Sequence, residues 1–137
     1  MSSKSAVLHD SDYAALADFR AALRSFTAFS ETKAAEVGLT PRQHQALLAI
    51  RGETSGQATI GFVAERLMLK PHSASELVDR LDAMGLIMRK AAAGDRRKTI
   101  LVLSDRANAV LAELSASHRE EIRRLKPLLL DLLSRFG

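Results

Sequence analysis

Apolar residues recur along most of this chain at spacings of three and four, which is the period of a helix with one buried face. The first such stripe, near the N-terminus, consists of Leu16, Phe19, Leu23 and Phe26. Gly38 is a suitable C′ residue for the end of this helix. Thr40-Pro41-Arg42-Gln43 then begins a second helix, because Thr is a good N-cap, Pro suits the first turn and Gln completes a capping box. The buried face of the second helix is predicted to hold Leu47, Leu48 and Ile50.

Two short helices joined by a tight turn are predicted in the middle of the chain. The first begins at about Gly61, and the chain turns at Met68-Leu69-Lys70. Pro71 opens the second helix and Gly85 closes it. The positions i, i+3, i+4, i+7 and i+10 of this second helix form one apolar stripe of Ala74, Leu77, Val78, Leu81 and Met84. Such a pair has the pattern of a helix-turn-helix.

A β-hairpin and a long helix are predicted to follow. Leu86-Ile87-Met88 and Thr99 to Leu103 are expected to be strands, and Gly94 to Lys98 the loop between them. Ser104 is expected to cap the long helix. Pro127 is expected to kink or break it, because proline lacks an amide donor and clashes with the preceding turn. Leu128 to Phe136 would then form a last apolar helix.

This order of elements predicts a mainly α fold: a winged helix-turn-helix with a small β-hairpin wing and a helix at each end. The chain has 137 residues, of which 47% are hydrophobic, so it is most simply a single domain, 1–137, with a real core. We assign the winged helix-turn-helix to residues 40–104 and the terminal helices, expected to mediate dimerisation, to residues 12–37 and 105–137.

The charge of the chain is concentrated at the hairpin. Between Leu86 and Arg106 there are six cationic side chains and two carboxylates, an excess of four that equals the net charge of +4 for the whole chain. The other residues therefore sum to zero. A cationic hairpin on an otherwise balanced surface is suited to a polyanion, and the preceding helix makes DNA the expected one.

The outward face of the helix that begins at Pro71 is a candidate for contact with a major groove. Small hydroxyl residues near its N-terminus permit close approach, Arg80 is able to bond phosphate or guanine, and Glu76 is able to accept from cytosine. The alternative is an ordinary solvated face, which the carboxylates of this helix favour. The face consists of His72, Ser73, Ser75, Glu76, Asp79 and Arg80.

The loop Gly94-Asp95-Arg96-Arg97-Lys98 supports a more specific interpretation. Arginine in a narrow minor groove gains from the focused negative potential there, and guanidinium is easier to desolvate than ammonium. Asp95 is then expected to orient an arginine of the wing, since a free carboxylate would repel phosphate. A solvated hairpin tip is the alternative.

The two ends of the chain carry more apolar surface than one small winged helix can cover. Because burial of one such side chain contributes roughly 1.5–3 kcal/mol, their exposure is unfavourable. Pairing with a second copy would bury them and would present two recognition helices about one DNA turn apart, ~34 Å. A monomer folded over its own core is the alternative. The expected interface contains Leu16, Phe19, Leu23, Ile122, Leu125, Leu129, Leu132, Leu133 and Phe136.

Other classes of function find little support. The chain has no cysteine, which removes disulfides, thiolate chemistry and the usual structural zinc sites. His9, His44, His72 and His118 lie far apart without metal-ligand spacing, and no Gly-rich phosphate loop is present. We therefore expect no enzyme, metal or cofactor. No secretory signal and no run of ~20 apolar residues is found, so a cytoplasmic protein without membrane contact is expected.

From about Leu16 onward the chain resembles the MarR family of bacterial transcription regulators. The combination is fairly specific, although each part alone would be weak. The matching residues are Leu39-Thr40-Pro41-Arg42-Gln43, Ala64-Glu65-Arg66-Leu67, Leu77-Val78-Asp79-Arg80-Leu81, Gly85-Leu86, Arg89, Asp95-Arg96-Arg97 and Leu103-Ser104.

The resemblance implies a homodimer that binds a pseudo-palindromic operator, usually as a repressor, and is released by a small aromatic or phenolic acid. It places Ser73, Ser75, Glu76 and Arg80 in the major groove, Arg97 with Arg96 in the minor groove, and Asp95 as the residue that holds the wing. Lys70 and Lys98 complete the expected DNA contacts, with Lys70 standing where the family usually has a hydroxyl cap. An aromatic carboxylate would suit a pocket of Phe19, Arg20, Phe26, His44 and Leu48. A packed core without ligand is the alternative at that place.

Two other functions remain open from the sequence. A winged helix that binds a partner protein would agree with the acidic residues of the recognition face, whereas the cationic wing argues against it. A helical protein that binds only small molecules would show no affinity for DNA even at low salt.

Overall fold

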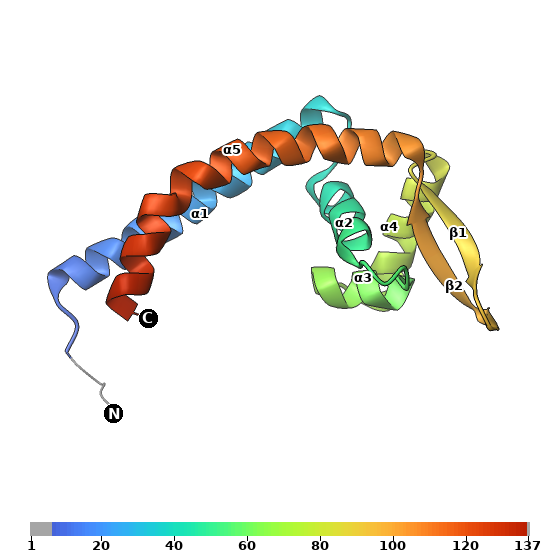
Figure 1. The fold of residues 1–137 in the computed structure, drawn as a ribbon, viewed down its shortest axis with the longest axis horizontal. Helices are drawn as coiled ribbons and strands as arrows, with labels where there is room; N and C mark the ends of the chain where they lie inside the picture. The colour runs from blue at the N-terminus through green and yellow to red at the C-terminus, as the bar shows by residue number, and fades with distance from the viewer. Residues whose placement is uncertain (1–6, 137) are drawn as a thin grey trace. The chain divides into compact units, whose positions relative to one another are not determined.

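The computed structural model describes residues 7–136, which form five helices and a two-stranded antiparallel sheet (Figure 1). The predicted fold, mainly helical with a β-hairpin wing, is confirmed. The last residue of the predicted range 105–137 and the first six of the predicted domain lie outside the described residues. The elements are α1 (Asp10–Glu36), α2 (Pro41–Gly52), α3 (Ile60–Leu67), α4 (Pro71–Ala83), β1 (Ile87–Ala92), β2 (Asp95–Leu103) and α5 (Asp105–Phe136).

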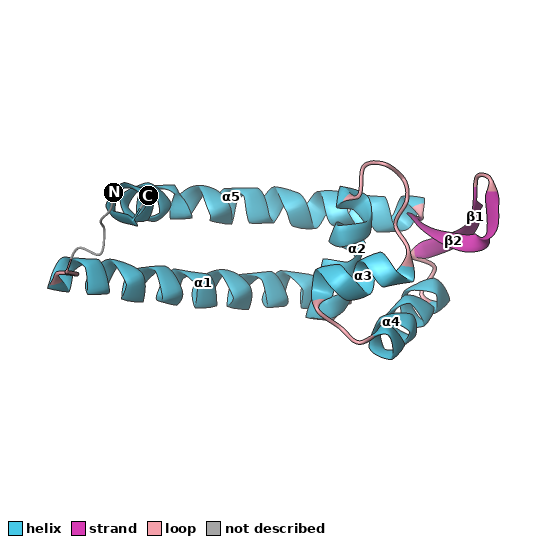
Figure 2. Cartoon of the chain, turned by 90° about the horizontal axis from the view of Figure 1, so that it is seen from below, coloured by secondary structure: helices cyan, strands magenta, loops and turns pink. Residues whose placement is uncertain are grey.

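The chain divides into two compact units. The first unit consists of residues 7–30 and 116–136, and the second unit consists of residues 31–115. The second unit holds α2, α3, α4 and the hairpin β1–β2, and the hairpin extends beyond the helices (Figure 2). The long helix α1 begins in the first unit and ends in the second, whereas α5 begins in the second unit and ends in the first.

Hydroxyl side chains set where the helices of the second unit begin. The Thr40 hydroxyl accepts from the N–H of Gln43 at 3.1 Å, and the Gln43 side chain accepts from the N–H of Thr40 at 3.0 Å, which confirms the predicted capping box. Thr59 caps α3 in the same way through the N–H of Phe62, a contact the sequence analysis did not identify. Each cap satisfies an amide that the helix itself leaves without a partner, and contributes roughly 1 kcal/mol.

The core of the second unit is aliphatic. Its largest fully buried side chains are Leu47, Val63, Val78, Leu81 and Leu86. They come from α2, α3, α4 and the residue before β1, so one cluster holds all these elements together. The predicted stripe of α4 is confirmed, with three members buried and two packed against the core. The prediction that Leu48 is buried is wrong: it is 49% exposed, because it lies on the opposite side of α2 from the buried Leu47 and Ile50.

The wing is longer and more regular than predicted. Arg96, Arg97 and Lys98, which were expected in a loop, belong to β2, and the turn consists of Ala93 and Gly94 alone. Gly94 has a φ of 81°, which glycine adopts without strain. The long strands pair from Ile87 with Leu103 to Ala92 with Asp95, with one irregularity at Ala91/Ala92. Pairing of the backbone amides and carbonyls favours this extension of both strands over a long unpaired loop.

The other edge of β2 is tied to the loop before α3. The N–H of Leu101 donates to the carbonyl of Ala58 at 2.8 Å. Ala58 is itself buried in the core. The wing is therefore anchored at its base from both sides, by β1 and by the α2–α3 connection, and only its outer part extends into solvent.

In the first unit, residues 10–30 of α1 and 116–136 of α5 run antiparallel. Arg135 near the end of α5 pairs with Asp12 near the start of α1 at 3.3 Å, and His118 contacts the Ser30 hydroxyl at 2.8 Å. The N–H of His9 and, more weakly, Arg135 hold the pKa of Asp12 below its ordinary value. This contact thus favours the folded state above that ordinary pKa, and the effect is lost as the pH falls through the lower, folded value.

The predicted break at Pro127 is wrong. The helix α5 continues through this residue to Phe136. Leu125 and Leu128, on either side of the proline, both line the same apolar groove against α1. Packing of the side chains on both sides of Pro127 thus offsets the missing amide hydrogen bond, which costs about 3 kcal/mol in an isolated helix interior.

A non-glycine residue adopts the left-handed conformation at the turn between α3 and α4. Met68 has φ 56° and ψ 44°, and its side chain is 92% exposed. We expect Met68→Gly to raise the free energy of unfolding by about 0.5–1 kcal/mol, because glycine relieves the steric cost of this conformation and no buried contact is lost. Urea denaturation measures the change. Met68→Ala, which keeps a Cβ, is the control, and equal stability of the two variants would contradict the expectation.

Candidate nucleic-acid interface

The helix α4 presents its N-terminal turn without a side-chain cap. Lys70 occupies the N-cap position, and its side chain makes no capping hydrogen bond. The side chain of the N-cap residue therefore accepts no hydrogen bond from the first amides of α4, whereas those of α2 and α3 do accept one. Such amides, at the positive end of the helix dipole, are suited to an anion such as a phosphate.

The solvent-facing side of α4 contains the residues that the sequence analysis selected. His72, Glu76 and Arg80 are exposed, whereas Ser73 and Ser75 are half-buried. Glu76 lies 3.4 Å from His72 one turn earlier, an exposed pair that holds the carboxylate beside an imidazole. Arg80 has no ion pair among the described residues, so its guanidinium is available to a ligand.

Two of the acidic residues of α4 are paired with one arginine of the wing. The guanidinium of Arg89, on β1, donates to Asp79 at 2.6 Å and to Asp82 at 2.9 Å. A single cation thus bridges two carboxylates from one face of α4. The acidic residues that seemed to disfavour DNA contact are therefore partners of Arg89, and they fix the position of the wing against α4.

The charges of the wing differ in how strongly they are paired. Oδ1 of Asp95 accepts from the N–H of Arg97 at 3.0 Å and lies 3.8 Å from the Arg97 guanidinium, which is 96% exposed. These are contacts of the kind that a wing-orienting aspartate makes. Arg96 and Lys90 have no carboxylate partner within residues 7–136.

Lys98 acts on a carboxylate outside the wing, that of Glu53. The hydroxyl and N–H of Ser55 donate to Glu53 and are the main cause of its lowered pKa. The N–H of Gln57 and the charge of Lys98 lower this pKa further. Lys98 thus lies near the α2–α3 loop, at the base of the wing, whereas Arg96 and Arg97 lie nearer its tip.

The residues predicted to form a ligand pocket belong to both units of the chain. Phe19 and Phe26 line a wholly apolar groove of about 350 Å³ between α1 and α5 in the first unit, while Arg20 is exposed on α1. His44 is buried in the second unit, where Leu48 lines other pockets. The prediction of one shared pocket is therefore not supported within either unit.

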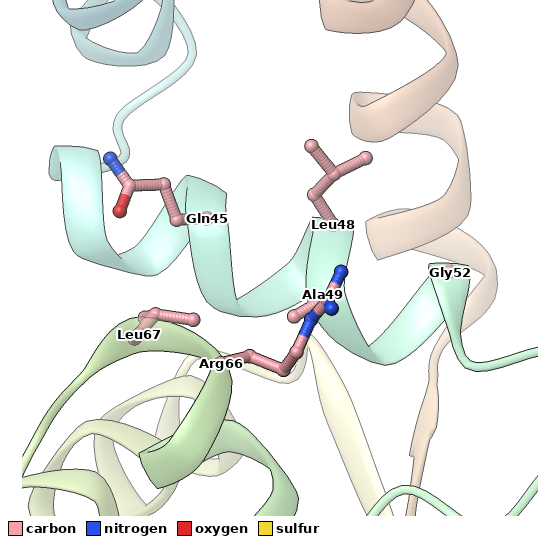
Figure 3. Close-up of a pocket in the computed structure, with 6 residues that line it drawn as sticks. All are labelled: Gln45, Leu48, Ala49, Gly52, Arg66 and Leu67. Carbon is pink, nitrogen blue, oxygen red and sulfur yellow. The ribbon is translucent and has the colours of Figure 1, made fainter. Parts of the chain in front are cut away.

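Leu48 instead belongs to a pocket of about 360 Å³ between α2 and α3 (Figure 3). The guanidinium of Arg66 extends from α3 toward α2 beside this pocket, and it also lies 5.9 Å from the centre of the Phe62 ring. An apolar floor with one cation at its edge is a surface suited to a small amphipathic anion. The lining residues are Gln45, Leu48, Ala49, Gly52, Arg66 and Leu67.

Sequence reasoning missed several of these contacts. Arg89 was recognised only as part of a motif, although an arginine a few residues after a helix with two carboxylates one turn apart is a signal for such a bridge. The pairing of Ala58 with β2 had no signal in the sequence, since it depends on the tertiary fold. Within the described residues, no three His, Asp or Glu side chains are grouped as metal ligands would be, and no helix is long and apolar enough to cross a membrane.

The geometry defines a winged helix-turn-helix: a tight turn between α3 and α4, an exposed α4, and a cationic hairpin fixed against it. Comparisons with known proteins agree with this class. Residues 37–98 match the sequence model of the MarR family. None of the curated proteins compared with the chain matches it in sequence.

Solved structures with this fold cover nearly the whole chain. A variant of MepR from Staphylococcus aureus, bound to an oligodeoxyribonucleotide, is 20% identical over 91% of this chain and 98% of its own, with a TM-score of 0.70. MepR itself, a regulator of the multidrug efflux pump MepA, is 18% identical over 87% and 96%, with a TM-score of 0.73. AbsC, a MarR family transcriptional regulator from Streptomyces coelicolor, is 22% identical over 93% and 84%, with a TM-score of 0.67.

The winged helix of this chain matches the sequence model of the MarR family, and the resemblance inferred from the sequence is thereby confirmed. The match spans α2, α3, α4, β1 and the beginning of β2. The structural likeness extends this result to the fold of the terminal helices, at identities that show the fold alone.

The bridge from Arg89 to the two carboxylates of α4 is expected to stabilise the fold modestly. All three side chains are more than a third exposed, so solvent screening limits each pair to about 0.5 kcal/mol. We expect Arg89→Met to lower the free energy of unfolding by about 1 kcal/mol at low salt and by less at high salt. Urea denaturation at two salt concentrations measures this, with Arg96→Met as the control because Arg96 has no such partner in the described chain. Equal, salt-independent effects of both variants would contradict the bridge.

Proposed function

We propose that the protein is a cytoplasmic transcription regulator, not an enzyme, that binds double-stranded DNA as a homodimer and acts as a repressor at a pseudo-palindromic operator. The observation that carries the proposal is the pairing of an exposed recognition helix, uncapped at its N-terminus, with an arginine-bearing wing fixed to it by Arg89. The expected contacts are those selected from the sequence: Lys70, His72, Ser73, Ser75, Glu76, Arg80, Arg96, Arg97 and Lys98.

The pairing of Asp79 and Asp82 with Arg89 supports DNA over a protein partner. Acidic residues on the recognition face were the main argument for a protein-interaction module. Because Arg89 bonds both carboxylates, its positive charge offsets half of the negative charge that they would otherwise present to a phosphate backbone. The exposed arginines of the wing then dominate the local field, which favours a polyanion.

The apolar surface of the first unit supports the homodimer. Among the apolar residues described there, only Ala15 and Leu132 are buried. Two antiparallel helices cannot enclose a core by themselves, so large side chains remain in solvent along both. A second copy of the same helices would cover them with a self-complementary face. The exposed large residues are Tyr13, Leu16, Leu23, Ile122, Leu129, Leu130, Leu133 and Phe136.

A small aromatic or phenolic acid is proposed as the effector that releases the DNA. The pocket between α2 and α3 supports it, because it joins apolar side chains to the cation of Arg66 within reach of the helix-turn-helix. A ligand there acts by favouring a dimer whose recognition helices no longer match adjacent major grooves. The proposed effector site thus includes Leu48 and Arg66.

The wing arginine is expected to contribute directly to DNA affinity. In Arg97→Ala, binding to a duplex selected by the wild type should weaken by ~1–3 kcal/mol, and the slope of log affinity against log salt should flatten by about one unit. Gel shifts at several salt concentrations measure both. Arg42→Ala removes the same charge far along the chain, on α2, and is the control; an unchanged Arg97→Ala affinity would refute the role of the wing.

Disruption of the apolar face is expected to separate the subunits. Leu133 is 66% exposed in the single chain, so a charge there costs little unless a partner covers it. We expect Leu133→Asp to shift sedimentation at micromolar concentration from dimer to monomer, and Ala93→Asp on the wing tip to leave the dimer intact. A wild-type chain that sediments as a stable monomer would exclude the proposed dimer.

Binding of an aromatic acid is expected to depend on Arg66. Benzoate and its hydroxylated derivatives, used as probes, should raise the melting temperature of the wild type in a thermal-shift screen and should do so less in Arg66→Gln. Arg42→Gln is the matched control. Equal shifts in both variants would place the ligand elsewhere, and no shift with any of the acids would remove this class of effector.

A further inference from the structure

The C-terminal end of α4 is tied to the first turn of α5. The last carbonyls of a helix have no partner within the helix. Here the carbonyl of Met84 accepts from Nη1 of Arg106 at 2.6 Å, and the carbonyl of Gly85 accepts from the hydroxyl of Ser104 at 2.8 Å. Two consecutive carbonyls at the end of the recognition helix are therefore satisfied by side chains from the beginning of another helix.

Ser104 connects the two helix ends directly. Its hydroxyl donates to Gly85 and also accepts from the N–H of Ala107 at 3.2 Å, which confirms the predicted cap of α5. Its own N–H donates to the carbonyl of Leu86 at 3.0 Å. The end of α4 and the start of α5 thus share one hydrogen-bonded junction at the base of the wing.

Arg106 adds a charge to this junction. Its guanidinium lies at the negative end of the α4 dipole, where a cation is favoured. Arg106 forms no ion pair within the described part of the chain, and its guanidinium donates to the backbone at the end of α4. Gly85, with a φ of 73°, reverses the chain at the same place, and a Cβ there would lie 4.0 Å from Nη1 of Arg106.

We propose that Arg106 is a positioning residue that fixes the orientation of the recognition helix relative to α5, without touching DNA. The core fixes the buried face of α4 and Arg89 fixes its flank, whereas Arg106 fixes its C-terminal end. The proposal rests on the proposed function, because orientation matters only if α4 reads DNA.

A small change of angle at this contact would be amplified along the length of α4. At 1.5 Å per residue, the N-terminal turn of α4 lies roughly 18 Å from the tether at its other end. A tilt of about 5° at the tether would displace that turn by about 1.5 Å, which is enough to break hydrogen bonds to base edges. Contacts to phosphate tolerate such a displacement better, because flexible Lys and Arg side chains follow the backbone of any duplex.

The alternative is that Arg106 binds phosphate itself, and the two roles differ in their salt dependence. A phosphate contact contributes about one unit to the slope of log affinity against log salt for any duplex. A positioning contact instead changes the ratio of specific to random binding and leaves that slope unchanged. The two measurements therefore separate the roles.

The test compares Arg106→Met, which keeps the length but removes the charge and the donors, with Arg106→Lys and with the charge-matched control Arg42→Met. Each full-length protein is titrated with a duplex enriched by the wild type from a random library and with a random duplex, over a range of salt. Hydrogen exchange of the amides of Met84, Gly85 and Leu86, measured without DNA, reports the junction itself.

In Arg106→Met we expect about fivefold to tenfold weaker binding of the enriched duplex. Random-duplex affinity should match that of Arg42→Met, the salt slope should match the wild type, and the three amides should exchange faster. Arg106→Lys should recover part of the specificity. A flattened salt slope, an unchanged specificity ratio or unchanged exchange would each overturn the proposal. If the wild type enriches no duplex, the proposed function fails, and the hydrogen exchange still shows whether Arg106 holds the end of α4.

Discussion

Burial of one apolar face of α4 is the constraint on which the rest of the winged helix depends. Val78 and Leu81 have no solvent exposure, and they share their cluster with side chains from α2, α3, both strands and α5. Loss of a single such side chain typically costs 2–5 kcal/mol, which is a large fraction of the stability of a small domain. Because the helical period fixes which residues face the core, it also fixes which residues face outward, so the packing of α4 determines its solvent-facing side.

Electrostatic contacts refine the orientation that packing sets. Arg89 bridges two carboxylates on the flank of α4, and Arg106 donates to its C-terminal end. Each contact is exposed and individually modest, but together they connect the recognition helix to the wing and to α5. A polar contact to a specific base requires this accuracy, whereas attraction to the phosphate backbone does not.

The two units of the chain have opposite balances of apolar surface. Residues 31–115 enclose a core, whereas the helical pair of the other unit leaves most of its large apolar residues in contact with water. The groove around Phe19 and Phe26 is lined entirely by apolar side chains. Contact of such a groove with water is unfavourable, and a partner surface that covers it would remove this free-energy cost. Residues 31–115 thus bury their apolar residues within their own unit, whereas the exposed apolar residues of the other unit support the proposed association of two chains.

The sequence by itself determined the identity of the elements. Period, caps and turn glycines are local signals, so the capping box at Thr40, the stripe of α4 and the ends at Gly38 and Gly85 were all predicted correctly. Local signals failed where distant residues decide. Pro127 remains helical because its neighbours pack against α1, and Arg96 to Lys98 are extended because β1 pairs with them.

Only the tertiary structure decided the environment of each functional side chain. It paired Asp79 and Asp82 with Arg89, placed Leu48 beside Arg66 and brought Arg106 to the end of α4. The physical reason is range: helix propensity and capping act within about four residues, whereas ion pairs, pockets and carbonyl partners depend on which distant segments the core brings together.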